Sequence, residues 1–334
     1  MFDERWSAEA FEVATAVRSM LEGKCDESVV RAAEAAEDGL APEVEKQLRS
    51  FGAYDLPNEP ELLAAVSMEL GRALAPVPWA EVAAVRAALG VEDAAYALDV
   101  APPYGPGSAV VPTSSGLGLV ANVGPRERTA AGDVLVRIDD AAPETRWGGD
   151  DARRLRALMR LLAAARVAGA ASKLVEIGVA YAGERTAFGR PIGSYQAVSH
   201  KLADAAIAAE GAELLVRKTA WLAGREGAGS APQPIFGIMV WNNAVEAGRQ
   251  VSRLVHQCMG GFGATLEYPA QLYSRRIRSW ALRLGRSGET YREVARILLD
   301  PAERDAVTGL WHEEQGLTIP RWARELDLTT NPRE

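Results

Sequence analysis

Cysteine and histidine are scarce in this 334-residue sequence, which contains two cysteines and three histidines. Two cysteines cannot build a disulfide framework or a cysteine-rich metal site. His200, His256 and His312 lie far apart, and none occurs in a metal-binding spacing such as H-E-x-x-H. The sequence therefore excludes a disulfide scaffold, and we expect no metal centre.

Positive charge is also in deficit, because 37 lysines and arginines face 45 aspartates and glutamates. A nucleic-acid-binding surface needs a clustered basic excess. The dense basic run Arg275-Arg276-Ile277-Arg278 is short, and a solvated helix face is its simplest interpretation. We therefore expect no nucleic-acid partner.

Long apolar runs are missing as well. Residues 155–182 form the most apolar stretch, but charged residues such as Arg160 and Glu176 interrupt it, so it does not predict a membrane span. The polar N-terminus lacks the basic-then-apolar pattern of a secretory signal. With 48% hydrophobic and 25% charged residues, the composition is that of a globular protein. We expect a cytoplasmic protein that makes no contact with a membrane.

Apolar spacing divides the sequence into four parts. Residues 1–78 predict an N-terminal helical domain, because apolar residues recur at helical spacing and prolines stand in first turns. Residues 79–150 open with a short helix (79–89), and then short β-type runs among glycines and prolines predict a small antiparallel β unit. Residues 151–300 predict a helical bundle, and residues 301–334 predict a peripheral tail. The fold class is therefore mainly α with a small central β unit.

The expected elements have these bounds. In the first part, helices occupy residues 8–50, with a new helix opening at Pro42, and continue from Pro60 to about Ala75. The β-type runs are residues 108–112, 117–120 and 133–138, and the four helices of the bundle are residues 155–181, 194–224, 232–259 and 289–299.

The first segment that departs from plain bundle sequence is Y-A-G-E-R-T-A-F-G-R-P-I-G-S-Y-Q, residues 181–196. The guanidinium of Arg185 can form paired hydrogen bonds to phosphate, the ring of Phe188 can stack, and glycines let the backbone approach closely. The loop therefore suits an anionic, flat ligand. The alternative is a helix–helix connector whose Phe188 and Ile192 pack into the core.

The second such segment is H-Q-C-M-G-G-F-G-A-T-L-E-Y-P, residues 256–269. Three glycines after a helix free backbone N–H groups, which can form an anion-binding nest. A glycine-rich helix end explains the same residues, and a single G-G-x-G is weak evidence. The two segments together, in one helical region, are a stronger signal than either one.

These two segments resemble the acyl-CoA dehydrogenase family, whose C-terminal bundle carries Y-A-x-E-R-x-x-F-G-x-P-I-x-x-(F/Y)-Q and Q-x-x-G-G-x-G-x-x-x-E-x-P. Residues 69–78 are a weaker match to the end of the family's N-terminal helical domain. The resemblance is specific over 155–285, fair over 45–80, faint or absent over 81–150 and absent beyond 300. It implies an acyl-CoA dehydrogenase-like fold with a reduced middle β-domain and a C-terminal four-helix bundle.

The resemblance also implies a cofactor. In the family, the two motifs mostly contact the pyrophosphate and adenosine end of the FAD that a neighbouring subunit binds. Carried over by position, FAD contacts are implied for Arg185, Phe188, Gln196, Gln257, Gly260 and Gly261.

The catalytic base of the family is absent. Its chemistry needs a carboxylate within reach of the acyl α-proton. The usual position, seventeen residues after Glu267, is Leu284, and the alternative position is Met159. Neither can accept a proton, so we predict no catalytic residue. Glu267 and Glu289 are nearby carboxylates, but solvated helix ends explain them more simply.

The β region departs from the family too. The L-T-E-P-x-x-G-S-D and W-I-T-N stretches that enclose the flavin ring and the thioester are missing, and Trp147 is followed by Gly148-Gly149-Asp150. A sheet this small is not expected to enclose a flavin ring.

The resemblance thus implies a degenerate subunit of a heteromeric, FAD-dependent acyl-CoA dehydrogenase. Bacterial complexes of this kind, notably those acting on steroid side chains, are α2β2 heterotetramers of one complete and one degenerate chain. The partner subunit would bear the catalytic glutamate, and the acyl-CoA substrate would be a steroid side-chain CoA ester. Two alternatives stay open: a self-sufficient homomeric enzyme with a displaced base such as Glu289, and a flavin-free structural or CoA-binding paralogue.

Overall fold

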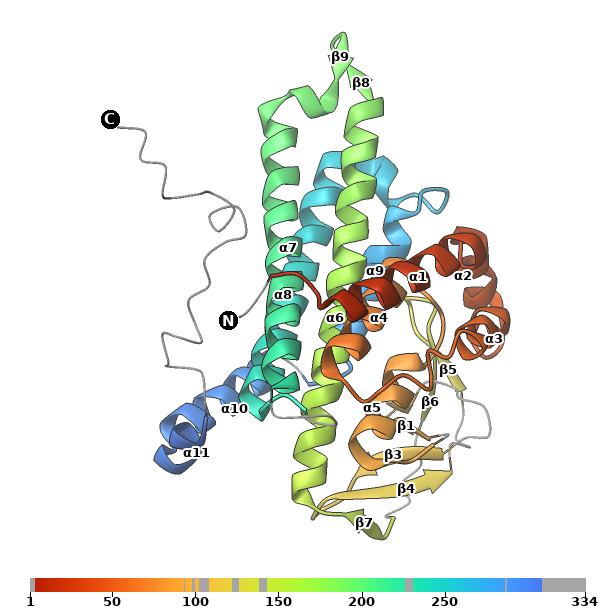
Figure 1. Ribbon diagram of the computed structural model, residues 1–334. Helices are drawn as coiled ribbons and strands as arrows, with labels where there is room; N and C mark the ends of the chain where they lie inside the picture. Colours follow the sequence, from red (N-terminus) through yellow and green to blue (C-terminus); the bar gives the residue numbers. More distant parts are fainter. Residues whose placement is uncertain are drawn as a thin grey trace.

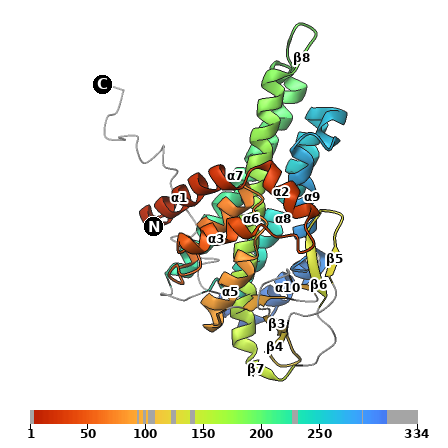
Figure 2. The ribbon, with the colours of Figure 1, turned by 90° about the vertical axis from the view of Figure 1, so that its right-hand side faces the viewer.

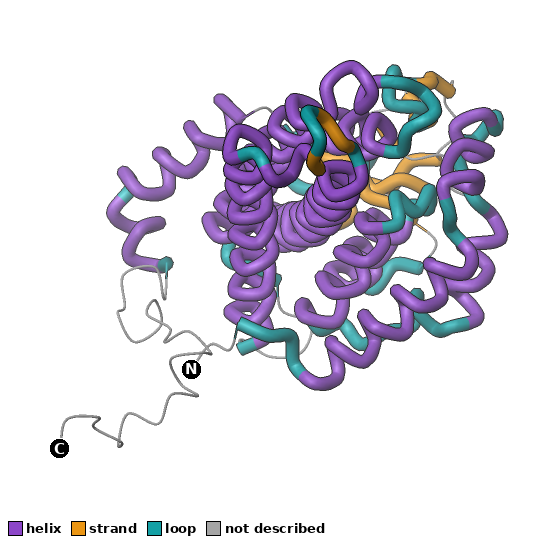
Figure 3. Tube along the Cα trace, turned by 90° about the horizontal axis from the view of Figure 1, so that it is seen from above, coloured by secondary structure: helices purple, strands orange, loops and turns teal. Residues whose placement is uncertain are grey.

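Long helices dominate the computed structural model, which describes residues 4–92, 94–97, 100–101, 108–121, 126–137, 143–225, 231–285 and 287–307. Seen from above, the long helices are grouped together, and most of the strands lie to one side of them (Figure 3). The predicted fold class, mainly α with a small β unit, is confirmed. The domain bounds at residues 78, 150 and 300 stay a prediction, and most of the expected tail lies outside the described residues.

Five helices make up the N-terminal region: α1 (Ala8–Lys24), α2 (Glu27–Ala35), α3 (Pro42–Ser50), α4 (Pro60–Arg72) and α5 (Trp79–Leu89). The predicted helical segment at residues 8–50 is confirmed, but it is divided into three helices because side chains cap new starts. The Ser7 hydroxyl accepts from the Ala10 N–H before α1, and the Asp26 carboxylate accepts from the Val29 N–H before α2. Pro42 and Pro60 open α3 and α4, as predicted.

Two small sheets lie beside the lower half of the bundle (Figure 1). One has the strand order β1-β3-β4-β7 and the other β2-β6-β5. The strands are β1 (Ala94–Tyr96), β2 (Val100–Ala101), β3 (Ser108–Pro112), β4 (Leu117–Ala121), β5 (Arg126–Arg128), β6 (Val134–Arg137) and β7 (Thr145–Trp147). Their pairs are antiparallel, as predicted, except that β1 runs parallel to β3.

The bundle is built around α6 (Gly149–Glu184), whose 36 residues give a length of about 54 Å. It is flanked by α7 (Gln196–Gly224), α8 (Pro234–Met259) and α9 (Ala270–Trp280), and α4 packs on it from the N-terminal region. The predicted fourth helix of the bundle exists as α10 (Ser287–Leu299), but it lies at the foot with α11 (Pro301–Ala306) (Figure 1). The place alongside α6 and α8 belongs to α9.

Helices α4 and α6 touch backbone to backbone. A Cβ on Gly71 would lie 1.9 Å from the carbonyl oxygen of Arg166, and a Cβ on Gly169 would lie 2.0 Å from that of Met68. The buried Ser67 hydroxyl donates across the same contact to the Leu162 carbonyl oxygen at 2.7 Å. The glycines thus set how closely the N-terminal region docks on the bundle.

Substituting Gly169→Ala is expected to lower the free energy of unfolding by about 1–3 kcal/mol, because the added methyl group forces two packed backbones apart. Urea unfolding followed by circular dichroism measures the change. Gly183→Ala is the matched control, since a Cβ at this other glycine of α6 would meet no atom within 4 Å. Equal unfolding midpoints for the two variants would contradict the close contact.

None of the helices in the described part of the chain combines the length and the apolar character that crossing a membrane requires.

Candidate functional site

A rigid hairpin joins α6 to α7 and projects beyond the end of the bundle (Figure 2). It comprises β8 (Thr186–Ala187), β9 (Arg190–Pro191) and the 3-10 turn η1 (Ile192–Ser194). The Ile192 N–H donates to the Arg185 carbonyl oxygen at 2.8 Å, and the Tyr195 hydroxyl donates to that of Ala187 at 2.9 Å. These bonds hold the tip in one shape.

The tip holds an aromatic side chain in solvent. Phe188 is 97% exposed and has a φ of +51°, which is rare for a residue with a side chain. The alternative in which Phe188 packs into its own core is therefore wrong, whereas Ile192 does pack against the core. The ring of Phe188 is therefore accessible to another molecule.

Arg185 and Gln196 flank the hairpin, at the end of α6 and the start of α7. Both side chains are exposed. Among the residues that the structure describes, no hydrogen bond or ion pair engages the Arg185 guanidinium. It is free to bind an anion.

The second motif lies where α8 ends. Gly260 has a φ of +62° and begins the 3-10 turn η2 (Gly260–Ala264). A Cβ on Gly260 or Gly261 would meet no atom within 4 Å, so a ligand can approach the backbone closely here, although the Gly260 N–H already donates to the His256 carbonyl oxygen. Gln257 is exposed, whereas its neighbour His256 faces α9 and bonds the Ser274 hydroxyl at 2.8 Å.

Three aromatic rings connect the two motifs. Tyr181 in the last turns of α6 stacks on Phe262 with ring centroids 5.7 Å apart, and Tyr268 lies 5.1 Å from Phe262. The pattern of the sequence did not single out these rings, although each stands inside a predicted motif.

The two motifs therefore lie at one end of the bundle. The six residues predicted to contact the ligand are all exposed: Arg185, Phe188, Gln196, Gln257, Gly260 and Gly261. Their role stays a prediction.

The two positions of the absent base also come together, beside the lower half of the bundle. Met159 in α6 and Leu284 after α9 are 2% and 7% exposed, and both line one cavity of about 30 Å³. Glu289 is exposed on α10 and Glu267 is exposed at the opposite end, and neither lines this cavity.

One carboxylate that sequence reasoning missed does line the cavity. Glu81 in α5 is 5% exposed and accepts from Arg166 at 3.0 Å. The Arg166 guanidinium lies over the ring of Trp280, 4.7 Å from its centroid. Because Glu81 is buried and held in an ion pair with Arg166, it is unsuited to removing a proton from a bound substrate.

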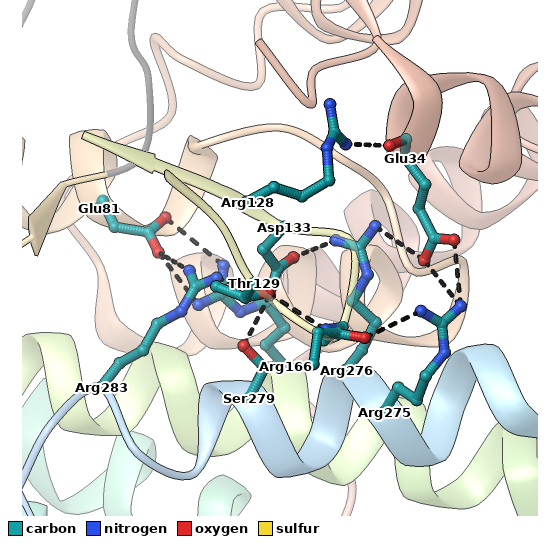
Figure 4. Close-up of polar contacts among 12 residues, drawn as sticks. Glu34, Glu81, Arg128, Thr129, Asp133, Arg166, Arg275, Arg276, Ser279 and Arg283 are labelled. Atoms are coloured by element: carbon teal, nitrogen blue, oxygen red, sulfur yellow. Dashed lines mark hydrogen bonds and ion pairs between the residues drawn. The ribbon is translucent and has the colours of Figure 1, made fainter. Parts of the chain in front are cut away.

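A buried network of charges continues from this cavity across three regions of the fold (Figure 4). Asp133, before β6, pairs with Arg276 and with Arg283 at 2.8 Å, and it accepts from the Ser279 hydroxyl at 2.8 Å. Glu34 of α2 pairs with Arg275 at 3.1 Å and with Arg276 at 3.3 Å.

The network corrects the interpretation of the basic run. Arg276 is 3% exposed, so the prediction of a solvated helix face is wrong for this residue, although Arg278 is exposed. Carboxylates that lie far away in the sequence, Glu34 and Asp133, compensate its charge. Burial alone would raise the pKa of Asp133, but the guanidiniums of Arg283 and Arg276 and the Ser279 hydroxyl hold it below its usual range.

Comparison with known proteins identifies the bundle. Residues 150–299 match the family described as "Acyl-CoA dehydrogenase, C-terminal domain". The bundle of this chain is therefore similar to the C-terminal domain of the acyl-CoA dehydrogenases. Among curated relatives, acyl-CoA dehydrogenase IpdE2 of Mycolicibacterium smegmatis is 32% identical over 163 residues, which cover 48% of this chain and 49% of the relative. The chain spans half or less of the length of the curated relatives that it matches.

Solved acyl-CoA dehydrogenase structures share the fold over most of the chain. The ChsE4-ChsE5 complex from Mycobacterium tuberculosis matches with a TM-score of 0.77 at 21% identity, covering 90% of this chain and 99% of the compared chain. The Tcur3481-Tcur3483 steroid acyl-CoA dehydrogenase matches with a TM-score of 0.74 at 22% identity, covering 88% and 98%. At these identities the likeness shows the fold.

Acyl-CoA dehydrogenases typically bind FAD. The end of the bundle that carries the two motifs and the cavity beside its lower half differ in how well they fit that group. The exposed end supplies a free guanidinium, an exposed amide and an open glycine backbone, which suit the phosphates and adenosine of a nucleotide. The cavity lined by Met159 and Leu284 does not fit the flavin ring. Its volume of about 30 Å³ is far below the roughly 300–1,000 Å³ typical of ligand pockets. In the described part of the chain, no cluster of potential ligands is placed to hold a metal ion.

Proposed function

We propose that this chain is the subunit without the catalytic base in a heteromeric, FAD-dependent acyl-CoA dehydrogenase. One observation carries the proposal: both positions of the family's base are apolar and line the same small cavity, while the two motifs predicted to contact the nucleotide are open to solvent. A chain of this kind can complete the site of another chain and cannot complete its own.

The proposed contribution is made at the exposed end of the bundle. Arg185 forms charge-assisted hydrogen bonds to the pyrophosphate, Phe188 packs against the adenosine region, and Gln257 with the Gly260-Gly261 backbone holds the ADP end. Gln196 at the start of α7 completes the set. The exposed position of every one of these residues supports their action toward a neighbouring subunit.

The partner subunit supplies the remaining parts. Its glutamate would remove the α-proton of an acyl-CoA thioester, and the FAD that this chain helps to hold would supply the acceptor for the β-hydride. The α2β2 assembly draws support from two structural neighbours, one a ChsE4-ChsE5 complex and the other a steroid acyl-CoA dehydrogenase of two named chains. A steroid side-chain CoA ester is accordingly the proposed substrate.

Expression of the chain alone and together with an acyl-CoA dehydrogenase subunit that carries the glutamate tests the proposal. The lone chain is expected to be colourless, and the pair is expected to purify as a yellow complex that reduces an electron-acceptor dye with steroid side-chain CoA esters. The flavin spectrum and dye reduction give the result.

Each alternative predicts a different outcome. Stoichiometric flavin on the lone chain, with turnover abolished by Glu289→Gln, would replace the proposal with a self-sufficient homomeric enzyme. A stable complex without flavin would favour a structural or CoA-binding role. The solvent-exposed position of Glu289, outside the cavity that holds Met159 and Leu284, weighs against the homomeric enzyme.

A further inference from the structure

The loop that follows the second motif carries a patch of apolar side chains, which consists of Tyr181, Phe262, Leu266 and Tyr268. Phe262 is 49% exposed, and Leu266, four residues later, is 70% exposed. Tyr181 stacks on Phe262 with an angle of 19° between the rings, and Tyr268 meets Tyr181 edge-on with ring centroids 5.8 Å apart. Single exposed apolar residues are common on protein surfaces, whereas several that are gathered in one place indicate a binding surface.

Hydrogen bonds hold this aromatic patch in one shape. The Thr265 N–H and hydroxyl both donate to the Phe262 carbonyl oxygen, at 3.2 and 2.9 Å. The Arg31 guanidinium of α2 donates to the Leu266 carbonyl oxygen, which connects the loop to the N-terminal region. Side chains that are fixed before binding lose little conformational entropy when a partner covers them. The rigidity of the patch therefore suits a contact with another protein.

Two carboxylates lie at the edge of the aromatic patch. Glu184 and Glu267 are exposed, and within the part of the chain that the structure describes no ion pair engages either one. Burial and the negative charge of Glu184 raise the pKa of Tyr268, so Glu184 lies close to the patch. A protein interface has an apolar centre and a polar rim, and opposite charges face each other across it. The surface that fits this patch is therefore apolar in its centre and basic at its edge.

The place of Phe262 in the chain indicates which molecule covers it. The residue directly follows Gly260-Gly261, where the ADP end of the nucleotide is proposed to bind, and consecutive Cα atoms are about 3.8 Å apart. A subunit whose FAD reaches the Gly261 backbone brings its own surface close to the ring of Phe262. The proposed nucleotide contact and the aromatic patch thus share one occupant.

From these observations we infer that the aromatic patch anchors the glutamate-bearing subunit through protein–protein packing, separately from the cofactor. The inference rests on the proposed function and extends it from nucleotide contacts to the assembly of the heteromer. Phe262 and Leu266 pack into an apolar recess of the partner, whose basic residues face Glu184 and Glu267. Rigid aromatic anchors of this kind carry a large share of the affinity of protein interfaces.

Assembly of the heteromer from its two purified subunits, in excess FAD, tests the inference. Phe262→Ser is expected to raise the subunit dissociation constant about 10–100-fold, and Leu266→Ser about 3–10-fold, in biolayer interferometry with the partner subunit immobilised. Because Leu266 is 70% exposed, its replacement keeps the fold intact, which thermal unfolding of the lone chain checks. Tyr291→Ser is the matched control: this aromatic residue is 57% exposed on α10, at the foot of the bundle (Figure 1), and its replacement is expected to keep the wild-type constant.

Flavin retention separates the aromatic patch from the nucleotide contacts. At subunit concentrations that saturate assembly, Phe262→Ser is expected to retain FAD like the wild type, whereas Arg185→Ala loses FAD at an unchanged subunit affinity. Wild-type assembly of both Phe262→Ser and Leu266→Ser would overturn the inference and leave the proposed function standing. Loss of FAD from the saturated Phe262→Ser complex would assign the ring to the cofactor and would also overturn the inference. A wild-type pair that does not assemble would contradict the inference and the proposed function together.

Discussion

Replacing Asp133 with asparagine is expected to lower the free energy of unfolding by about 3–5 kcal/mol. The carboxylate is 6% exposed and pairs with Arg276 and Arg283, so its loss leaves two guanidiniums in a low-dielectric environment with only the longer pairs to Glu34 and Glu81. The amide retains the shape and can still accept from the Ser279 hydroxyl. Urea unfolding at neutral pH measures the difference.

Asp150→Asn is the matched control, since Asp150 lies at the exposed start of α6 and pairs there with Arg153. An exposed pair of this kind contributes at most about 1 kcal/mol. If Asp133→Asn lowers the free energy of unfolding as little as the control does, the structural role of the network is contradicted.

The Asp133 carboxylate also makes the free energy of unfolding depend on pH. Because the pKa of Asp133 is lowered in the folded state, its stabilising contribution is complete above the unfolded-state pKa of about 3.9. It is lost as the pH falls through the lower folded-state value. The wild-type chain is therefore expected to lose stability below about pH 4 more steeply than Asp133→Asn.

Replacing Arg185 with alanine is expected to weaken flavin retention in the assembled heteromer about 10–100-fold, equivalent to about 1–3 kcal/mol. Its guanidinium is exposed and free of partners among the described residues, so the substitution removes a ligand contact and leaves the fold intact. Equilibrium dialysis of the complex against free FAD gives the change in dissociation constant.

Arg225→Ala controls for the loss of an exposed arginine at the far end of α7, where Arg225 lies over the ring of Trp221. It is expected to leave flavin retention unchanged. If Arg185→Ala also retains flavin like the wild type, the nucleotide contact proposed for the hairpin is wrong.

Local signals in the sequence were sufficient for most of the helices. The helix at residues 79–89 was predicted with the bounds that the structure has, because the proline pair before it and Gly90 after it are strong start and stop signals. The two motifs could be located for a similar reason, since each includes the end of a long helix and glycines that stop it. Their exposure and their common end of the bundle required the fold.

The charged network could not be predicted, because its pairs join residues that are distant in the sequence. Arg276 pairs with Asp133 and Glu34 across separations of 143 and 242 residues, and nothing near Arg276 indicates such partners. The burial of Glu81 depends in the same way on Arg166. The parallel pair of β1 and β3 is another non-local result, since β1 has only three residues.

Helix α6 carries Met159, at one predicted position of the family's base, and ends next to Arg185, a predicted FAD contact. Met159 and Arg185 lie on the same rod, 26 residues apart, which corresponds to about 39 Å along its axis. Over that distance, a change in the side chains packed around Met159 does not alter the backbone at Arg185. Under the proposed function, Met159 and Leu284 could therefore replace the proton acceptor without a change in the hairpin that carries Arg185.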